Sequence, residues 1–191
     1  MKKNYIEKEI KLRVANPLEL IETLKSEGAE FLGKTFEKTL RFEKEGQGLE
    51  KEGIFLRLKS GFVNKITLKK KLKTSSDVFE REEIETTVGD IEKMRAILNS
   101  LGFTNEFIME KYRQNWKFNG TEIALDEMPF GFFIEIEGEE SRIWDTCEKL
   151  KLDSSNKIVV TYWDLFDDHK KETGLVSEHI QFEKDYIVIL G

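Results

Sequence analysis

Strict alternation of charged and apolar residues is the main pattern along this chain. Residues 5–14 read YIEKEIKLRV, in which every second residue from Glu7 to Arg13 is charged, and residues between them, such as Ile10 and Leu12, are mostly apolar. Successive side chains of a β-strand point to opposite faces of a sheet. The period of two therefore predicts a strand with one apolar and one charged face.

The same alternation returns further along the chain. A β segment is predicted over residues 31–42, and Met128 to Gly131 has the composition of a turn between two later strands. Charged residues again take one face of each segment and apolar residues the other. The alternating segments are 54–60 (IFLRLKS), 64–72 (NKITLKKKL), 78–86 (VFEREEIET), 110–118 (EKYRQNWKF), 121–127 (TEIALDE) and 132–138 (FFIEIEG).

Helices are predicted between some of these strands. Asn16 followed by Pro17 is a typical helix start, and an apolar stripe at helical spacing continues to Gly28. Further helices are expected at about 90–101, 141–150 and within 161–171. Cys147 has apolar neighbours at helical spacing, so we expect a buried thiol rather than a nucleophile.

The composition is that of a soluble globular protein. The chain has 191 residues, of which 36% are charged and 39% hydrophobic, enough for one domain with a core. Its formal net charge of −6 argues against a general binder of nucleic acid or anionic membranes, because such partners usually meet basic domains. A single cysteine and the lack of a signal-peptide or membrane-spanning pattern indicate a cytoplasmic protein.

For one strand, solvation explains a charged face well enough. Repeated over about seven strands, such faces favour a closed or nearly closed barrel with an ionic interior, since solvated faces usually also contain Ser, Thr and Gln. Buried charges need ion-pair partners or metal. The acids recur as pairs that suit Mg²⁺ or Mn²⁺, and the bases recur as pairs that suit a polyphosphate. The acidic pairs are Glu7/Glu9, Glu83/Glu85 and Glu135/Glu137, and the basic pairs are Lys11/Arg13, Arg57/Lys59, Lys69/Lys71 and Lys111/Arg113.

In their order along the chain, these residues resemble the CYTH family, also called the triphosphate tunnel metalloenzymes. The family includes class IV adenylate cyclases, thiamine triphosphatases and inorganic triphosphatases. The resemblance implies an α+β fold, an eight-stranded antiparallel β-barrel with helices packed on the outside. It implies a single domain, taken as 1–191, with a core of about 3–165. The extension of about 166–191 has no counterpart in the family, and we expect its segment EHIQFEKDYIVIL to add a strand or a homodimer contact. The matching motifs are Glu7-x-Glu9-x-Lys11, Arg57-x-Lys59, Lys69, Arg81-x-Glu83, Lys111-x-Arg113, Asp126 and Glu135-x-Glu137.

The resemblance also implies roles for individual residues. Catalytic roles fall to Lys11 and Glu83, and Mg²⁺ or Mn²⁺ is the expected cofactor. A small-molecule triphosphate is the expected partner. The implied metal ligands are Glu7, Glu9, Asp126, Glu135 and Glu137, and the implied phosphate contacts are Lys11, Arg57, Lys59, Lys69, Arg81, Lys111 and Arg113.

Three functions stay open at this point. A triphosphatase is favoured because hydrolysis needs fewer specific groups, and a class IV adenylate cyclase producing cyclic AMP and pyrophosphate is the main alternative. A non-catalytic polyphosphate binder is disfavoured, because uncompensated carboxylates repel phosphate. If none of these holds, the charges are simply solvated, and neither tripolyphosphate nor Mg²⁺ shifts the melting temperature.

Overall fold

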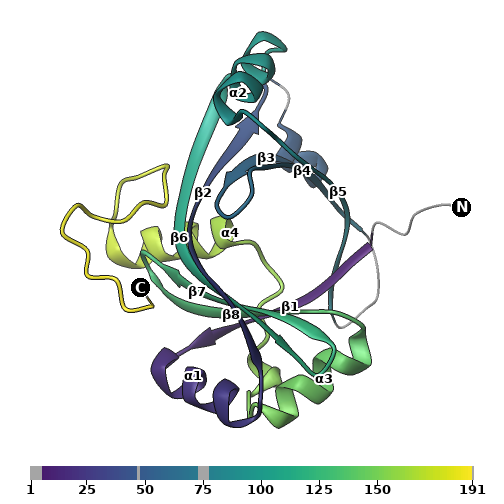
Figure 1. The fold of residues 1–191 in the computed structure, drawn as a ribbon. Coiled ribbons are helices and arrows are strands. Elements are labelled where there is room, and N and C mark those ends of the chain that lie inside the picture. Colours follow the sequence, from purple (N-terminus) through teal and green to yellow (C-terminus); the bar gives the residue numbers. More distant parts are fainter. Residues whose placement is uncertain (1–5, 47, 73–77, 191) are drawn as a thin grey trace, which may run out of the picture.

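The computed structural model describes residues 6–46, 48–72 and 78–190. Within these ranges, eight antiparallel strands close on themselves in the order β1, β5, β4, β3, β2, β6, β7, β8 (Figure 1). The predicted fold class is confirmed, although Tyr5 at the start of the first predicted strand lies outside the described residues. The strands are β1 (Ile6–Val14), β2 (Glu30–Glu43), β3 (Ile54–Ser60), β4 (Lys65–Lys71), β5 (Phe79–Thr87), β6 (Asn105–Phe118), β7 (Thr121–Met128) and β8 (Gly131–Glu137).

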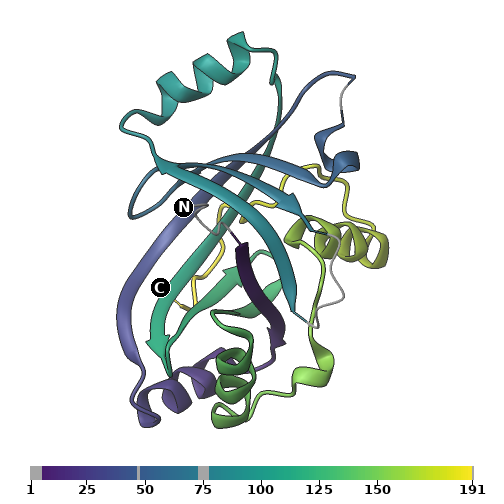
Figure 2. The same ribbon diagram turned by 90° about the vertical axis from the view of Figure 1, so that its right-hand side faces the viewer.

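Helices pack on the outside of the closed sheet (Figure 2). The predicted helix start is confirmed, because the Asn16 side chain accepts a hydrogen bond from the Glu19 N–H. No helix in the described part of the chain is long and apolar enough to cross a membrane. The helices are α1 (Pro17–Ser26), α2 (Ile91–Ser100), α3 (Glu140–Lys149) and α4 (Tyr162–Thr173), with 3₁₀ turns at Leu49–Glu52 and Ser154–Asn156.

The hydrophobic core lies between the outer face of the sheet and the helices. Ile10 and Ile136, from the apolar faces of β1 and β8, pack with Leu24 of α1 and Ile143 of α3 in the largest cluster. Cys147 of α3 is buried in the same cluster, as expected. On the opposite part of the barrel, α2 covers apolar residues of β2 and β3. The inner face of the sheet carries most of the charged residues, and Met109 and Phe133 on that face pack in a further apolar cluster with Tyr162 and Phe166 of α4.

The first residues of helix α4 reach the central cavity of the barrel. Thr161 and Asp164 form a reciprocal capping box, in which each side chain accepts a hydrogen bond from the other residue's backbone N–H. This cap fixes the start of the helix, so that Thr161, Tyr162 and Trp163 contribute to the wall of the central cavity.

The C-terminal extension contains no strand in its described part, so the predicted added strand is wrong. In the described residues after Gly174, β-type pairing with the barrel is limited to a bridge between Met109 and Ile180. The buried carboxylate of Glu127 also holds the extension, because it accepts hydrogen bonds from the backbone N–H groups of Ile189 and Leu190. The predicted homodimer contact stays a prediction.

Candidate functional site

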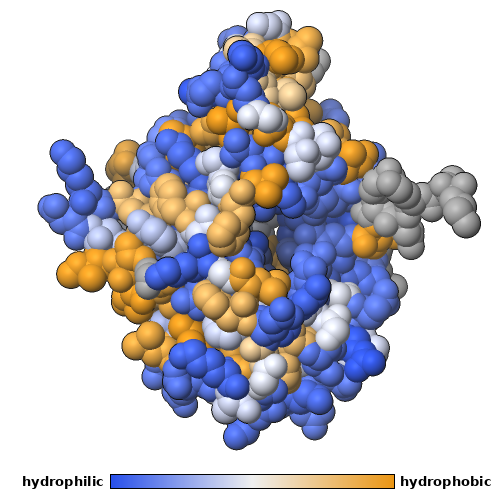
Figure 3. Space-filling view, in the orientation of Figure 1, coloured by the Kyte–Doolittle hydropathy of each residue, from blue (hydrophilic) through white to orange (hydrophobic). Residues whose placement is uncertain are grey.

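A charged tunnel runs through the barrel. It is a cavity of about 750 Å³, and all eight strands contribute side chains to its wall. Its entrance appears as a central hollow among hydrophilic residues (Figure 3). Every predicted site residue except Asp126 lines this cavity, and Asp126 lies directly behind the wall in contact with two wall residues. The predicted site residues therefore lie around one cavity, and their individual roles stay predictions.

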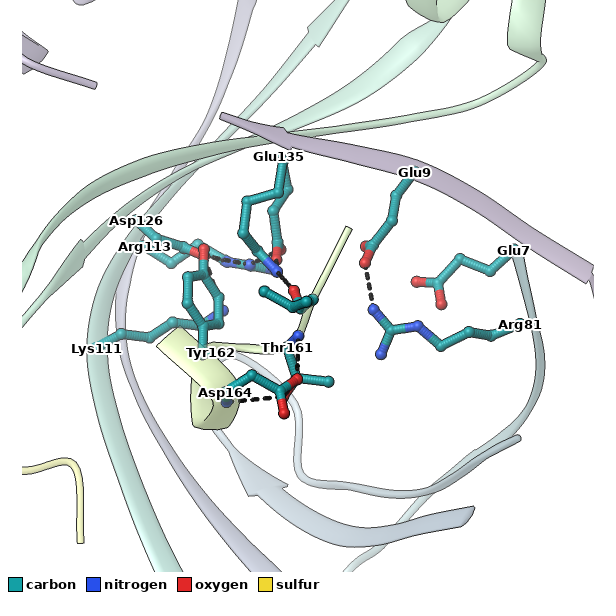
Figure 4. Close-up of polar contacts among 12 residues, drawn as sticks. Glu7, Glu9, Arg81, Lys111, Arg113, Asp126, Glu135, Thr161, Tyr162 and Asp164 are labelled. Carbon is teal, nitrogen blue, oxygen red and sulfur yellow. Dashed lines mark hydrogen bonds and ion pairs between the residues drawn. The ribbon is translucent and has the colours of Figure 1, made fainter. Parts of the chain in front are cut away.

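Asp126 is a buried anchor for two cations. It is fully buried and accepts hydrogen bonds from Lys111 Nζ at 3.0 Å and from Arg113 Nε at 2.6 Å (Figure 4). The Tyr162 hydroxyl also donates to this carboxylate, at 2.8 Å. Because these donors surround the carboxylate, Asp126 positions Lys111 and Arg113 in this structure, and a role as metal ligand would compete with that function.

Lys11 is held from three directions. Its Nζ lies 3.2 Å from Glu135 Oε1 and 3.4 Å from the Val160 carbonyl oxygen, and it stands 4.1 Å from the centroid of the Tyr162 ring. Glu135 also accepts from Arg113. Burial opposes ionisation of Glu135, but Lys11 and Arg113 hold its pKa well below the usual range. Glu135 is therefore an ionised carboxylate that holds Lys11 in place.

Glu7 and Glu83 share one lysine. Lys69 Nζ lies 2.6 Å from Glu7 Oε2 and 2.7 Å from Glu83 Oε2. Burial and the neighbouring Glu83 raise the pKa of Glu7, whereas Lys69 and the hydrogen bond with Glu7 lower that of Glu83. The two carboxyl groups are thus inequivalent: Glu7 retains a proton more readily and Glu83 stays ionised.

A row of carboxylates occupies the neighbouring wall. Glu9, Glu137 and Glu122 are directly opposite one another across β1, β8 and β7. Glu9 pairs with Arg81 (Figure 4). Burial and repulsion from Glu7 raise the pKa of Glu137 to about 7. Excess negative charge therefore gathers at this wall.

A second cationic group surrounds Glu37. Burial opposes its ionisation, yet Arg113, Lys111 and Lys59 lower its pKa to about 2. Burial in turn lowers the pKa of Lys59 to about 8, although Glu37 opposes the shift. Arg57 also lines the tunnel and forms no ion pair within the described part of the chain.

The cavity-lining residues that the sequence analysis did not single out include Glu37, Arg41, Glu122 and Tyr162. Glu37 and Arg41 alternate with apolar residues in β2, and Glu122 alternates in β7, so the period of two could have found them. Tyr162 begins a helix, and no strand pattern could show that it reaches Asp126.

The fold and the inward-facing charges define a tunnel protein of the CYTH type. The CYTH domain model matches residues 5–162, and the chain belongs to this family. A Methanocaldococcus jannaschii protein provisionally named adenylate cyclase is 31% identical over 77% of this chain and 83% of its own length.

Solved structures agree on the fold. The PH1012 protein of Pyrococcus horikoshii has a TM-score of 0.70 and 25% identity, covering 82% of this chain and 96% of its own. A Hippeastrum protein, provisionally named adenylyl cyclase and described as showing a dominant triphosphatase activity, has a TM-score of 0.61 and 18% identity. That likeness covers 86% of this chain and 95% of the Hippeastrum chain.

Proposed function

We propose that this protein is a divalent-metal-dependent triphosphatase that cleaves an organic or inorganic triphosphate inside its tunnel. The observation that carries the proposal is the two-sided wall of the cavity. Lys11, Lys69, Lys111 and Arg113 are positioned by buried acids, while Glu9, Glu122 and Glu137 form a separate anionic row. A triphosphate needs cations along its oxygens and a place where metal neutralises the remaining charge.

The protein side chains would do most of the positioning. Lys69, Lys111 and Arg113 would exchange part of their carboxylate contacts for phosphate oxygens, and Arg57 offers a guanidinium without an ion pair to break. Lys11 would stabilise negative charge on the leaving oxygen. Glu83, held ionised by Lys69, would orient the attacking water and accept a proton from it. As the water oxygen bonds to the terminal phosphorus, the bond from that phosphorus to the bridging oxygen breaks. The diphosphate end leaves, and the attacked group is released as orthophosphate.

The anionic row fits a divalent cation chemically. Carboxylates are the ligands that Mg²⁺ and Mn²⁺ prefer, and the raised pKa of Glu137 marks a place where positive charge would relieve repulsion. No three acidic, His or Cys side chains of the described residues converge closely enough to hold a metal, because Glu7 and Glu9 turn toward Lys69 and Arg81. Glu7, Glu9, Glu135 and Glu137 would hold the ion, which would neutralise phosphate charge when bound.

A class IV adenylate cyclase is the second candidate, favoured by the provisional name of the Methanocaldococcus relative. In that reaction the ribose 3′-hydroxyl attacks the α-phosphorus of ATP and pyrophosphate leaves. Both reactions would use the same phosphate contacts. The Hippeastrum neighbour carries a cyclase name and a triphosphatase description together, so a name does not decide between them.

Phosphorus NMR separates the candidates directly. The protein is incubated with ATP, thiamine triphosphate and tripolyphosphate in turn, first with Mg²⁺ and then with Mn²⁺. Orthophosphate as the product supports the triphosphatase. Pyrophosphate with cyclic AMP as the products would overturn the triphosphatase proposal and support the cyclase.

The substitutions Glu7→Gln and Glu137→Gln test whether the protein binds polyphosphate without cleaving it. We expect both substitutions to abolish turnover while leaving metal-free anion binding intact or tighter, because each removes a carboxylate that repels phosphate. Binding without turnover by the unmodified protein would instead support a polyphosphate-binding module and overturn the enzyme proposal.

A further inference from the structure

Arg41 is a tunnel cation that the proposed triphosphate contacts do not include. It lies on the inner face of β2, lines the cavity and is only 7% exposed. Its guanidinium carbon lies 4.5 Å from the centroid of the Phe107 ring and 4.6 Å from that of Trp163. These aromatic contacts, one from β6 and one from the first turn of α4, fix the plane of the guanidinium.

The hydrogen-bonding capacity of Arg41 is largely unused. Its buried Nε and Nη1 atoms form no hydrogen bond within the described part of the chain. An exposed carboxylate, that of Glu50, lies 3.3 Å from Nη1 as an ion pair. Buried donors are rarely left without partners, and a guanidinium carries its charge at any physiological pH. An anion in the tunnel would satisfy both atoms.

A second guanidinium stands beside it. Arg57 on β3 is directly opposite Arg41 in the sheet register, and its buried Nε also lacks a hydrogen bond among the described residues. Other tunnel cations, including Lys59 and Lys111, already face tunnel carboxylates. Two adjacent arginines with open donors thus form the part of the wall best prepared for an anion.

Arg41 continues the series of tunnel cations that would contact phosphate. The triphosphate contacts Lys59 and Lys111 both lie near Glu37 of β2. Arg41 lies four residues from Glu37 on the same strand, a span of about 13 Å. Arg57 lies level with Arg41, and Lys59, two residues further along β3, lies level with Thr39. The cations therefore continue from Lys59 to the neighbouring pair of Arg57 and Arg41.

We propose that Arg41, together with the adjacent triphosphate contact Arg57, forms a subsite for a fourth phosphoryl group. This inference rests on the proposed function, since it assumes that a triphosphate occupies the neighbouring cations. The fourth group would belong either to a condensed inorganic phosphate or to an organic tetraphosphate. Its oxygens would accept hydrogen bonds from the open donors of both arginines.

Isothermal titration calorimetry of the full chain without divalent metal tests the subsite. The probes are inorganic tripolyphosphate, inorganic tetrapolyphosphate and adenosine 5′-tetraphosphate. We expect the unmodified protein to bind at least one tetraphosphate about tenfold or more tighter than tripolyphosphate, as one charge-assisted contact allows. The tetraphosphate that binds tighter identifies the source of the fourth group.

Variants assign the effect to Arg41. Arg41→Gln should remove the preference for four phosphates and change tripolyphosphate binding less than about threefold, and Arg41→Lys should remove most of it, since lysine lacks the fixed donor fork. Arg142→Gln, the same change at an exposed position on α3, should have no effect. Glu50→Gln, at an exposed position that leaves the fold intact, should tighten tetraphosphate binding by removing the competing carboxylate.

The outcomes separate this inference from the proposed function. Binding of tripolyphosphate with no preference for four phosphates, or equal losses for both chain lengths in Arg41→Gln, overturns the subsite and leaves the triphosphate site standing. Failure of the unmodified protein to bind any of the probes overturns the subsite, whereas the proposed function is decided by the phosphorus NMR experiment with Mg²⁺ and Mn²⁺.

Discussion

Asp126 shows at the scale of one residue how the fold depends on charges inside the tunnel. Replacement by Asn keeps the shape but leaves Lys111 and Arg113 facing a neutral amide. Breaking a buried ion pair on one side typically costs about 3–5 kcal/mol, and Glu37 and Glu135 still face these cations, so we expect a loss of about 3 kcal/mol.

The measurement is the free energy of unfolding from urea titration, with Asp145→Asn on the exposed face of α3 as the control. Tripolyphosphate should stabilise Asp126→Asn more than the unmodified protein, because the phosphate can occupy the released donors. A loss below about 1 kcal/mol, in the range of a surface pair, would show that Asp126 does not anchor the cluster.

Glu137 makes stability depend on pH in a defined direction. Its folded-state pKa of about 7 lies above the ordinary 4.5, so the folded state binds more protons than the unfolded state between these values. The contribution to stability is therefore complete below about pH 4.5 and is lost as the pH rises through 7. Because the side chain is exposed to solvent in the tunnel, screening should limit the effect to about 1 kcal/mol.

Glu137→Gln should therefore be more stable than the unmodified protein at pH 8 and show little difference at pH 4. Melting temperatures measured at both pH values in metal-free buffer check this. If the difference in melting temperature between variant and parent is the same at both pH values, ionisation of Glu137 does not destabilise the folded protein.

At the scale of elements, Glu127 connects the C-terminal extension to the barrel. Its carboxylate accepts from the Ile189 and Leu190 N–H groups and from the Tyr186 hydroxyl at 2.9 Å. Glu127→Gln replaces one acceptor oxygen by a donor. We expect local opening of the extension to increase about tenfold or more, as the loss of one hydrogen bond to a charged group allows.

Amide hydrogen exchange at Ile189 and Leu190 measures this opening, and trypsin cleavage after Lys184 reports it independently. Glu172→Gln, on the exposed face of α4, is the matched control. Unchanged exchange at both amides in Glu127→Gln would mean that apolar packing, for example of the fully buried Ile180, holds the extension instead.

The elements themselves were predictable where a period was visible. Alternation identified β1 and β3 to β8 with their inner faces, because a strand half buried against helices must separate charged from apolar side chains. It could not place the extension, whose attachment depends on backbone N–H groups meeting one distant carboxylate. Nor could it show that Trp163 and Tyr162 reach the tunnel, since this depends on where α4 begins.

For the whole molecule, closure of the sheet is what brings opposite charges together. Strand β1 completes the barrel by pairing with both β8 and β5, and the two seams differ in length. Among the residues that the structure describes, the β1–β5 seam contains four residue pairs, Ile6–Glu9 with Phe79–Glu82, whereas β2 and β6 pair along nearly their whole length. Two ion pairs connect β1 with the strands on the other side of this short seam: Glu7 pairs with Lys69 of β4, and Glu9 pairs with Arg81 of β5.

We therefore expect the barrel to open first between β1 and β5. Local opening requires the least free energy where few backbone hydrogen bonds and little apolar burial must be lost. In the free protein, amides that pair across Ile6–Glu9 and Phe79–Glu82 should exchange faster than those of Lys111 or Tyr112 in β6. Saturating tripolyphosphate should slow exchange at this seam most. A ligand that contacts cations of β4, β5 and β6 at once binds only the closed sheet, and it therefore stabilises the closed form relative to the open one. Uniform protection around the barrel would instead mean that the sheet opens as one cooperative unit and that the charges across the seam add no local weakness.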